Sequence, residues 1–394
     1  MNTGHGGAPP AGTVRDLRLD FFRGLALFSI FIDHIPNNVL AQFTLQTVGM
    51  SDAAEVFILI SGYAAGMVYG RVLDRQGMVL ATARIYHRVW QLYVAHVFLF
   101  MLFMAAVAHS MGALDNPLYA EEFRAADFLK EPDVAIIKAL TLQFQPAFMD
   151  ILPLYIVLLG VLPLMLAGFR RAPLAVLGAS FLLWFAVQLD RSIALPAYPG
   201  ANQVWFFNPF AWQFLFFTGA WFGWHGTWGG AAWLASRWLL LAALAFAVPA
   251  FIIRISWTVH YFFDPFPALF AKAVWPWLSK TDLSAARLLN VLALALLVAR
   301  LVRPDARFFA SAVARPFVIS GRHSLHIFCL GILLSVIGHL VINEYFGGVP
   351  MQLAVSAAGV AIMVGVAALM EWFGSAMPQP HRAAPQQPGG KGGS

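Results

Sequence analysis

Long runs of apolar residues recur along the whole chain, each close to the roughly 20 residues that cross a bilayer. Shorter polar segments, several with proline or glycine, separate them. This pattern predicts an all-α, polytopic integral membrane protein with about ten transmembrane helices. We expect spans at 19–40, 52–70, 85–110, 149–168, 173–190, 209–225, 232–254, 285–302, 318–342 and 351–374. The composition agrees, because 60% of the 394 residues are hydrophobic and only 11% are charged.

Basic residues gather on one side of this predicted topology, in segments near 71–88 and 300–315. This bias indicates that both termini are cytoplasmic. The net charge of +6 then reflects topology. We expect no nucleic-acid partner, since no basic patch is interleaved with stacking aromatic residues outside the spans.

The chain divides into three predicted parts. Residues 1–14 and 377–394 are rich in glycine and proline and are expected to be disordered. Residues 15–376 form the transmembrane domain, with short helices expected in the long outer loop at 112–147. Cys329 is the only cysteine, so no disulfide forms within the chain, and no HExxH spacing is present. We therefore expect no metal and no bound cofactor. A homo-oligomer is left open.

The first predicted span, LDFFRGLALFSIFIDHIPNNVL, carries Asp20, Arg23, Asp33 and His34. Ionisable residues are costly in hydrocarbon and mostly line a pathway or a site. At about 100° and 1.5 Å per residue, Arg23 and His34 lie within roughly 20° of each other and roughly 16 Å apart. Pro36 ends or bends the helix near its outer boundary. A histidine there can accept a proton from a substrate hydroxyl, whereas a buried structural histidine is the alternative.

The second span begins in SDAAEVFILISGYAAGMVYG. Asp52 and Glu55 have the spacing of a helix N-cap with an acid at N3, which is a structural role. Glu55 also enters the membrane near the predicted level of His34, so it is a candidate to orient that imidazole. Ser61 and Tyr63 are candidates to line a channel, and the glycine between them favours close helix packing.

Polar residues also mark the outer ends of later spans. Amide and indole groups suit carbohydrate recognition, although tryptophan at an interface is usually an anchor. A basic pair there binds an anion or extends its charge to the membrane surface. These candidates are Asp150 and Tyr155 in the fourth span, Asn208, Trp212 and Gln213 in the sixth, and Lys280 and Arg287 in the eighth.

The ninth span contains SGRHSLHIFCL. In one continuous helix, Arg322 and His326 are four residues apart and His323 and His326 three apart, so each pair shares a face. The topology places them toward the cytoplasm, where arginine suits binding of a phosphorylated donor. The alternatives are a positive-inside anchor and hydrogen bonds between helices.

Six blocks in order resemble the OpgC family, the succinyltransferases of osmoregulated periplasmic glucans. They are RLDFFRGLALFSIFIDHIPNN, SDAAEVFILISGYAAGMVYG, ILPLYIVLL, FNPFAWQFLFFTGAWFG, LSKTDLSAARLL and GRHSLHIFCLG. The resemblance implies a multi-pass inner-membrane enzyme that moves a succinyl group from cytoplasmic succinyl-CoA to a hydroxyl of a periplasmic glucan. Acyl-CoA, the glucan and membrane lipids would be its partners.

The resemblance also implies roles for the candidate residues. His34 would be the general base, and the carboxylates of Asp33, Glu55 or Asp150 would polarise it or hold the sugar. Other acceptors, a lipid or another polysaccharide, are open, as are an acyl-enzyme on His34 and a non-enzymatic transporter. The donor side would comprise Arg23, Ser61, Tyr63, Arg322, His323 and His326. The acceptor side would comprise Asp52, Asp150, Tyr155, Asn208, Trp212, Gln213, Lys280 and Arg287.

Overall fold

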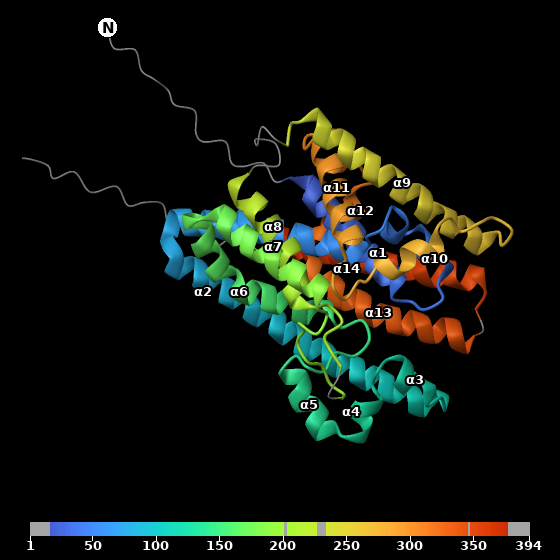
Figure 1. Cartoon of the computed structure of the whole chain (residues 1–394). Coiled ribbons are helices and arrows are strands. Elements are labelled where there is room, and N and C mark those ends of the chain that lie inside the picture. Colours follow the sequence, from blue (N-terminus) through green and yellow to red (C-terminus); the bar gives the residue numbers. More distant parts are fainter. Residues whose placement is uncertain (1–15, 201–202, 227–233, 346, 377–394) are drawn as a thin grey trace, which may run out of the picture.

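The computed structural model describes residues 16–200, 203–226, 234–345 and 347–376. Within them the regular secondary structure is helical, and loops with two isolated β-bridges connect the helices (Figure 1). The expected disordered ends at 1–14 and 377–394 lie outside the described residues. The helices are α1 (Leu17–Asp33), α2 (Ala53–Leu114), α3 (Leu118–Glu122), α4 (Ala126–Lys130), α5 (Pro132–Leu140), α6 (Ile151–Arg171), α7 (Pro173–Leu189), α8 (Pro209–His225), α9 (Arg237–Phe262), α10 (Ala271–Val274), α11 (Ala285–Leu301), α12 (Arg315–Arg322), α13 (Ser324–Glu344) and α14 (Val349–Ala376).

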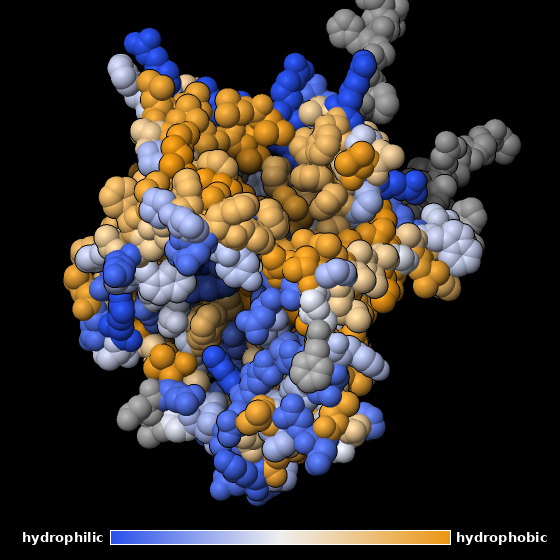
Figure 2. All heavy atoms as spheres, turned by 90° about the vertical axis from the view of Figure 1, so that its right-hand side faces the viewer, coloured by the Kyte–Doolittle hydropathy of each residue, from blue (hydrophilic) through white to orange (hydrophobic). Residues whose placement is uncertain are grey.

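Among the described residues, five helices are long and apolar enough to cross a membrane: α2, α6, α9, α13 and α14. The shorter α7 is also apolar. On the face shown in Figure 2, a broad hydrophobic region lies between hydrophilic side chains at the upper rim and a large hydrophilic area below. The protein is therefore a multi-pass membrane protein. The count of ten spans and the cytoplasmic termini stay predictions.

The second and third predicted spans lie on one helix, α2, which Gly77 divides into two arms (Figure 1). We expected a connecting segment at 71–84, but every residue of it except Gly77 is helical. Gly77 has φ 82° and ψ 174°, a backbone conformation that glycine adopts without strain. The segment contains no proline and only this glycine, so nothing else in it interrupts the helix.

The ninth predicted span is not one continuous helix, so this prediction is wrong. The helix is interrupted at His323, between α12 and α13. His323 has φ −103° and ψ 33°, outside helical values. Tertiary packing explains the break. The backbone of α12 lies directly against α1, and a Cβ on Gly321 would lie 1.9 Å from the carbonyl oxygen of Asp20. α13 continues from the break in another direction and packs against both α1 and α14. Arg322 and His326 therefore do not share a helix face.

The first helix ends just before Pro36, as this proline predicted. α1 stops at Asp33, and the backbone N–H of His34 donates to Ile30 O at its C-terminus. Two 3₁₀ turns, η1 (Val39–Phe43) and η2 (Leu45–Thr47), then lead back to α2. The end of α1 thus opens into a loop, which leaves the His34 side chain beyond the last helical turn.

The long loop after α2 forms the short helices α3, α4 and α5, as expected, and it is attached to the end of α13 by polar contacts. Tyr119 Oη donates to Glu344 Oε1 at 2.5 Å, and His339 Nε2 lies 2.8 Å from Glu122 Oε1. Burial and the neighbouring Glu344 carboxylate raise the pKa of Tyr119 to about 12, so its phenol stays protonated as the donor.

Candidate functional site

Two cavities with polar linings lie along α1, one beside Arg23 and the other beside His34. The first, of about 210 Å³, is lined by Arg23, Ser61 and Arg322 among others, and we call it the Arg23 cavity. The second, of about 300 Å³, is lined by His34 and Asp150 among others, and we call it the His34 cavity. Arg23 and His34, aligned by helix periodicity, therefore face two separate spaces.

His34 lies in its cavity with one ring nitrogen unsatisfied. Its Nδ1 is buried and has no hydrogen-bond partner among the described residues. The ring of Phe148 lies against the imidazole, with centroids 4.6 Å apart and planes inclined by 31°. Phe148 has φ 69°, a left-handed conformation that a residue with a bulky side chain adopts only when its surroundings impose it. Phe148 was not a candidate from the sequence.

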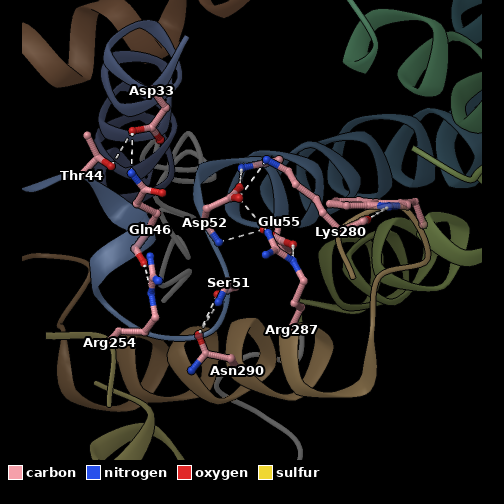
Figure 3. A network of polar contacts seen from close by, with 12 residues as sticks. Asp33, Thr44, Gln46, Ser51, Asp52, Glu55, Arg254, Lys280, Arg287 and Asn290 are labelled. Carbon is pink, nitrogen blue, oxygen red and sulfur yellow. Dashed lines mark hydrogen bonds and ion pairs between the residues drawn. The ribbon is translucent and has the colours of Figure 1, made fainter. Parts of the chain in front are cut away.

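Asp33 also lines the His34 cavity, but other groups already hold its carboxylate (Figure 3). Thr44 Oγ1 donates to Asp33 Oδ1 at 2.7 Å, and the Gln46 amide approaches the same oxygen at 3.5 Å. Arg254 Nε in turn donates to the backbone oxygen of Gln46 at 2.9 Å. Asp33 is thus part of a network that ties the end of α1 to the loop before α2 and to α9.

The predicted capping box at the start of α2 is confirmed (Figure 3). Asp52 Oδ1 accepts from Ala54 N at 2.8 Å, and Glu55 Oε2 accepts from Asp52 N at 2.9 Å. The other carboxylate oxygen of each acid meets a cation: Asp52 Oδ2 lies 2.8 Å from Lys280 Nζ and 2.7 Å from Arg287 Nη2, and Glu55 Oε1 lies 2.6 Å from Arg287 Nε.

This network changes the expected role of Glu55. Its side chain is fully buried, both carboxylate oxygens bond to Arg287 or to the backbone of Asp52, and it does not line the His34 cavity. Glu55 is therefore not placed to orient His34, because the capping box directs it toward α11. Asp52 and Lys280 do line the cavity, while Arg287 lies behind them.

Asp150 is the carboxylate of the His34 cavity with an unused oxygen. It is 8% exposed, and its Oδ1 is buried with no hydrogen-bond partner in the described part of the chain. It occupies the N-cap position of α6, yet its side chain makes no capping hydrogen bond. Its side chain is therefore available to a bound molecule.

Arginines are the charged residues that line the Arg23 cavity. The described residues that line it include three arginines and no acidic residue. Arg88 is one of these arginines and was not a candidate from the sequence. Asp20 lies behind the wall, 4.0 Å from Arg23 Nη1 and 3.7 Å from Arg322 Nε. Glu371 of α14 binds Arg322 as well.

Some predicted site residues lie elsewhere than expected. Tyr155 lines the Arg23 cavity and not the acceptor side, because it sits one helical turn further along α6 than Ile151, which lines the His34 cavity. Tyr63 lines a third, mostly apolar groove between α1, α2 and α11. His323 lies 3.7 Å from Glu371, whereas His326 is exposed and lines neither cavity.

The three candidates at the start of α8 line neither cavity and make hydrogen bonds within the protein. Asn208 is fully buried and caps the helix, its side chain accepting from Phe210 N at 3.1 Å. The Trp212 indole donates to the backbone oxygens of Lys280 and Thr281 at 3.0 and 3.2 Å, which positions the loop that carries Lys280. The Gln213 amide bonds to Ser180 of α7.

Sequence reasoning also missed residues that come from loops. Arg124 belongs to the segment after α3, and Phe206 and Phe207 precede α8, yet all three line the His34 cavity. Lys280 Nζ lies 5.6 Å from the ring centre of Phe207, within cation–π range. No periodicity marks such residues, since only the fold brings these loops together. In the described residues no group of three His, Cys, Asp or Glu side chains could hold a metal ion.

The fold and its two cavities define a class of protein: a helical, multi-pass membrane protein with polar sites inside its helix bundle. The family model of the OpgC protein matches residues 15–375. Because this match covers nearly the whole chain, the protein belongs to the OpgC family, which confirms the resemblance of the six sequence blocks. Membership indicates a membrane-bound transferase. No curated protein and no solved structure matches the chain.

Proposed function

We propose that the protein is a transmembrane O-acyltransferase that moves a succinyl group from cytoplasmic succinyl-CoA to a hydroxyl of a periplasmic glucan, with His34 as the general base. One observation carries the proposal. A histidine with an unpartnered, buried Nδ1 lines a polar cavity at one end of α1, and a basic cavity lies toward the other end.

The Arg23 cavity suits the donor. Coenzyme A carries phosphate groups, and guanidinium groups bind phosphate oxygens through two parallel hydrogen bonds. Arg23, Arg88 and Arg322 line the cavity, with Ser61 and Tyr155 as further polar groups. Arg23 and His34 are roughly 16 Å apart along α1, a span that a thioester on an extended pantetheine arm can reach.

The His34 cavity suits a sugar acceptor. Phe148, Phe206 and Phe207 provide aromatic surfaces on which a sugar ring can pack, and Asp150 has a carboxylate oxygen free to accept a hydroxyl proton. Lys280, which lies beside Phe207, adds a hydrogen-bond donor. An acceptor hydroxyl held by these groups would lie beside the imidazole.

The chemical step follows from this placement. The acceptor hydroxyl loses its proton to the His34 imidazole as its oxygen attacks the thioester carbonyl carbon. The carbon–sulfur bond breaks, the ester forms, and the coenzyme A thiolate takes the proton from the imidazolium. Asp52, which lines the same cavity, would stabilise the imidazolium that forms in between, whereas the charge of its neighbour Lys280 opposes it.

The test is transfer of label from a set of radiolabelled acyl-CoAs to periplasmic glucan by the purified protein. We expect labelled glucan from succinyl-CoA, and we expect His34→Ala to abolish transfer while its thermal unfolding stays close to wild type. His326→Ala is the matched control, since this exposed histidine on α13 lines neither cavity. Transfer by His34→Ala at the wild-type rate would overturn the assignment. Coenzyme A binding without transfer indicates another acceptor, and no binding favours a transporter.

A further inference from the structure

The walls of the two cavities share one aromatic ring, which stacks on a second ring. Phe328 of α13 lines both cavities, and Phe57 of α2 lines the Arg23 cavity. Their rings are stacked, with centroids 6.2 Å apart and planes inclined by 29°. Both side chains are buried, at 2% and 5% exposure. They make the only described aromatic stack that contributes to both cavity walls.

The surrounding helices show that the wall between the two cavities is thin. Along α2, Ala53 and Ala54 line the His34 cavity and Phe57 lines the Arg23 cavity. Along α6, Ile151 lines one cavity and the next residue, Leu152, lines the other. Each helix changes from one cavity to the other within a single turn, so only one layer of side chains separates them.

We propose that the Phe57–Phe328 pair closes the passage between the donor and acceptor cavities, and that these two rings limit the size of the acyl group that reaches His34. The inference rests on the proposed function, because it names what limits the same transfer. A thioester held in the Arg23 cavity reaches the His34 cavity only across this layer. Neither ring carries a polar atom, so a change of rotamer breaks no hydrogen bond.

The size limit follows from the shape of the barrier. When the two stacked rings move apart, a short, unbranched acyl group can pass between them. A longer or branched acyl group must displace the rings further. The next residue of α2 that lines the Arg23 cavity, one helical turn from Phe57, is Ser61, whose side chain is small. Each methylene in such an apolar site changes selectivity by about 10- to 200-fold. Removing one ring should therefore broaden the acyl range.

The passage is tested without any enzyme assay. In a Cys329→Ser background, Ala54→Cys places a thiol in the wall of the His34 cavity, and a membrane-impermeant thiol reagent is added to one side or the other of reconstituted vesicles. We expect labelling from one side only. Adding Phe328→Ala should allow labelling from both sides. Phe57→Ala is the second variant if Phe328→Ala fails to fold. Phe181→Ala removes a stacked ring on α7 that lines neither cavity and should leave labelling one-sided.

The size limit is tested by the ratio of transfer rates for longer and shorter acyl-CoAs. We expect Phe328→Ala to raise this ratio at least tenfold and Phe328→Tyr to leave it near wild type. One-sided labelling in both alanine variants would overturn the passage, and an unchanged ratio would overturn the size limit. If labelling becomes two-sided but no variant transfers an acyl group, the passage stands and the proposed function fails.

Discussion

Arg287 Nε binds the fully buried carboxylate of Glu55 at 2.6 Å, which joins α11 to the start of α2. The same guanidinium reaches Asp52, so one arginine holds both acids of the capping box. Asp52 in turn contacts Lys280 in the His34 cavity. The cavity wall is therefore built on a buried ion pair that does not itself face the cavity.

Arg287→Ala should destabilise the protein by about 3–5 kcal/mol, because it leaves the buried charge of Glu55 uncompensated. The measurement is thermal unfolding in detergent, followed by tryptophan fluorescence. The double variant Glu55→Gln with Arg287→Met should recover much of this loss, since no unpaired charge remains. Equal unfolding temperatures for the single and double variants would contradict the account.

Lys280→Met should weaken acceptor binding more than it weakens the fold. The Lys280 side chain is 31% exposed, so its ion pair with Asp52 contributes at most about 1 kcal/mol to stability. Loss of a charged hydrogen-bond donor from the cavity should raise the KM for the glucan about 10- to 100-fold. Steady-state kinetics with varied glucan measures this, and Lys272→Met on α10 is the control. An unchanged KM with a large fall in unfolding temperature would indicate a structural lysine.

Phe148 should matter through the ring that lies on His34. Phe148→Ala removes the ring, and we expect kcat to fall about 10- to 100-fold because the imidazole is no longer held in place. Phe148→Tyr keeps the ring and should keep most of the activity. Phe43→Ala, which removes an exposed ring stacked on Phe262, is the control.

The backbone at residue 148 allows a separate check. Since φ there is 69°, Phe148→Gly should be more stable than Phe148→Ala by about 1 kcal/mol, although neither variant has the ring. Thermal unfolding of the two variants measures the difference. If alanine is the more stable of the two, the residue is not strained in the folded protein.

Gly24→Ala should disrupt the crossing of α1 and α12. A Cβ at Gly24 would lie 1.9 Å from the carbonyl oxygen of Phe317, so the helices must separate, and the Arg23 cavity, to which α1 contributes Arg23 and α12 contributes Arg322, would change. We expect a loss of at least about 1–3 kcal/mol in stability and loss of transfer. Gly160→Ala on α6 is the matched control, since no described atom beyond its own stretch of helix lies within 4 Å of its Cβ position. Gel filtration and thermal unfolding compare the two, and similar behaviour would contradict the predicted contact.

Local features were predicted well because neighbouring residues determine them. The spacing of Asp52 and Glu55 predicted the capping box, and Pro36 predicted the end of α1. Gly62 was expected to allow close packing, and a Cβ there would lie 2.1 Å from the carbonyl oxygen of Phe216 on α8. The break at His323 was missed because it depends on the contact between α12 and α1 and not on the local sequence.

The sequence by itself determined that this is a helical membrane protein of the OpgC family whose first helix carries charged residues on one stripe. Apolar run length and helical periodicity are properties of consecutive residues, so they can be recognised without a fold. Only the tertiary structure decided which groups meet. It placed Phe148 and Asp150 in one cavity with His34, directed Glu55 toward Arg287, and stacked the ring of Phe57 on that of Phe328, which lines both cavities. These contacts join residues from different helices and loops, which come together only when the chain is folded.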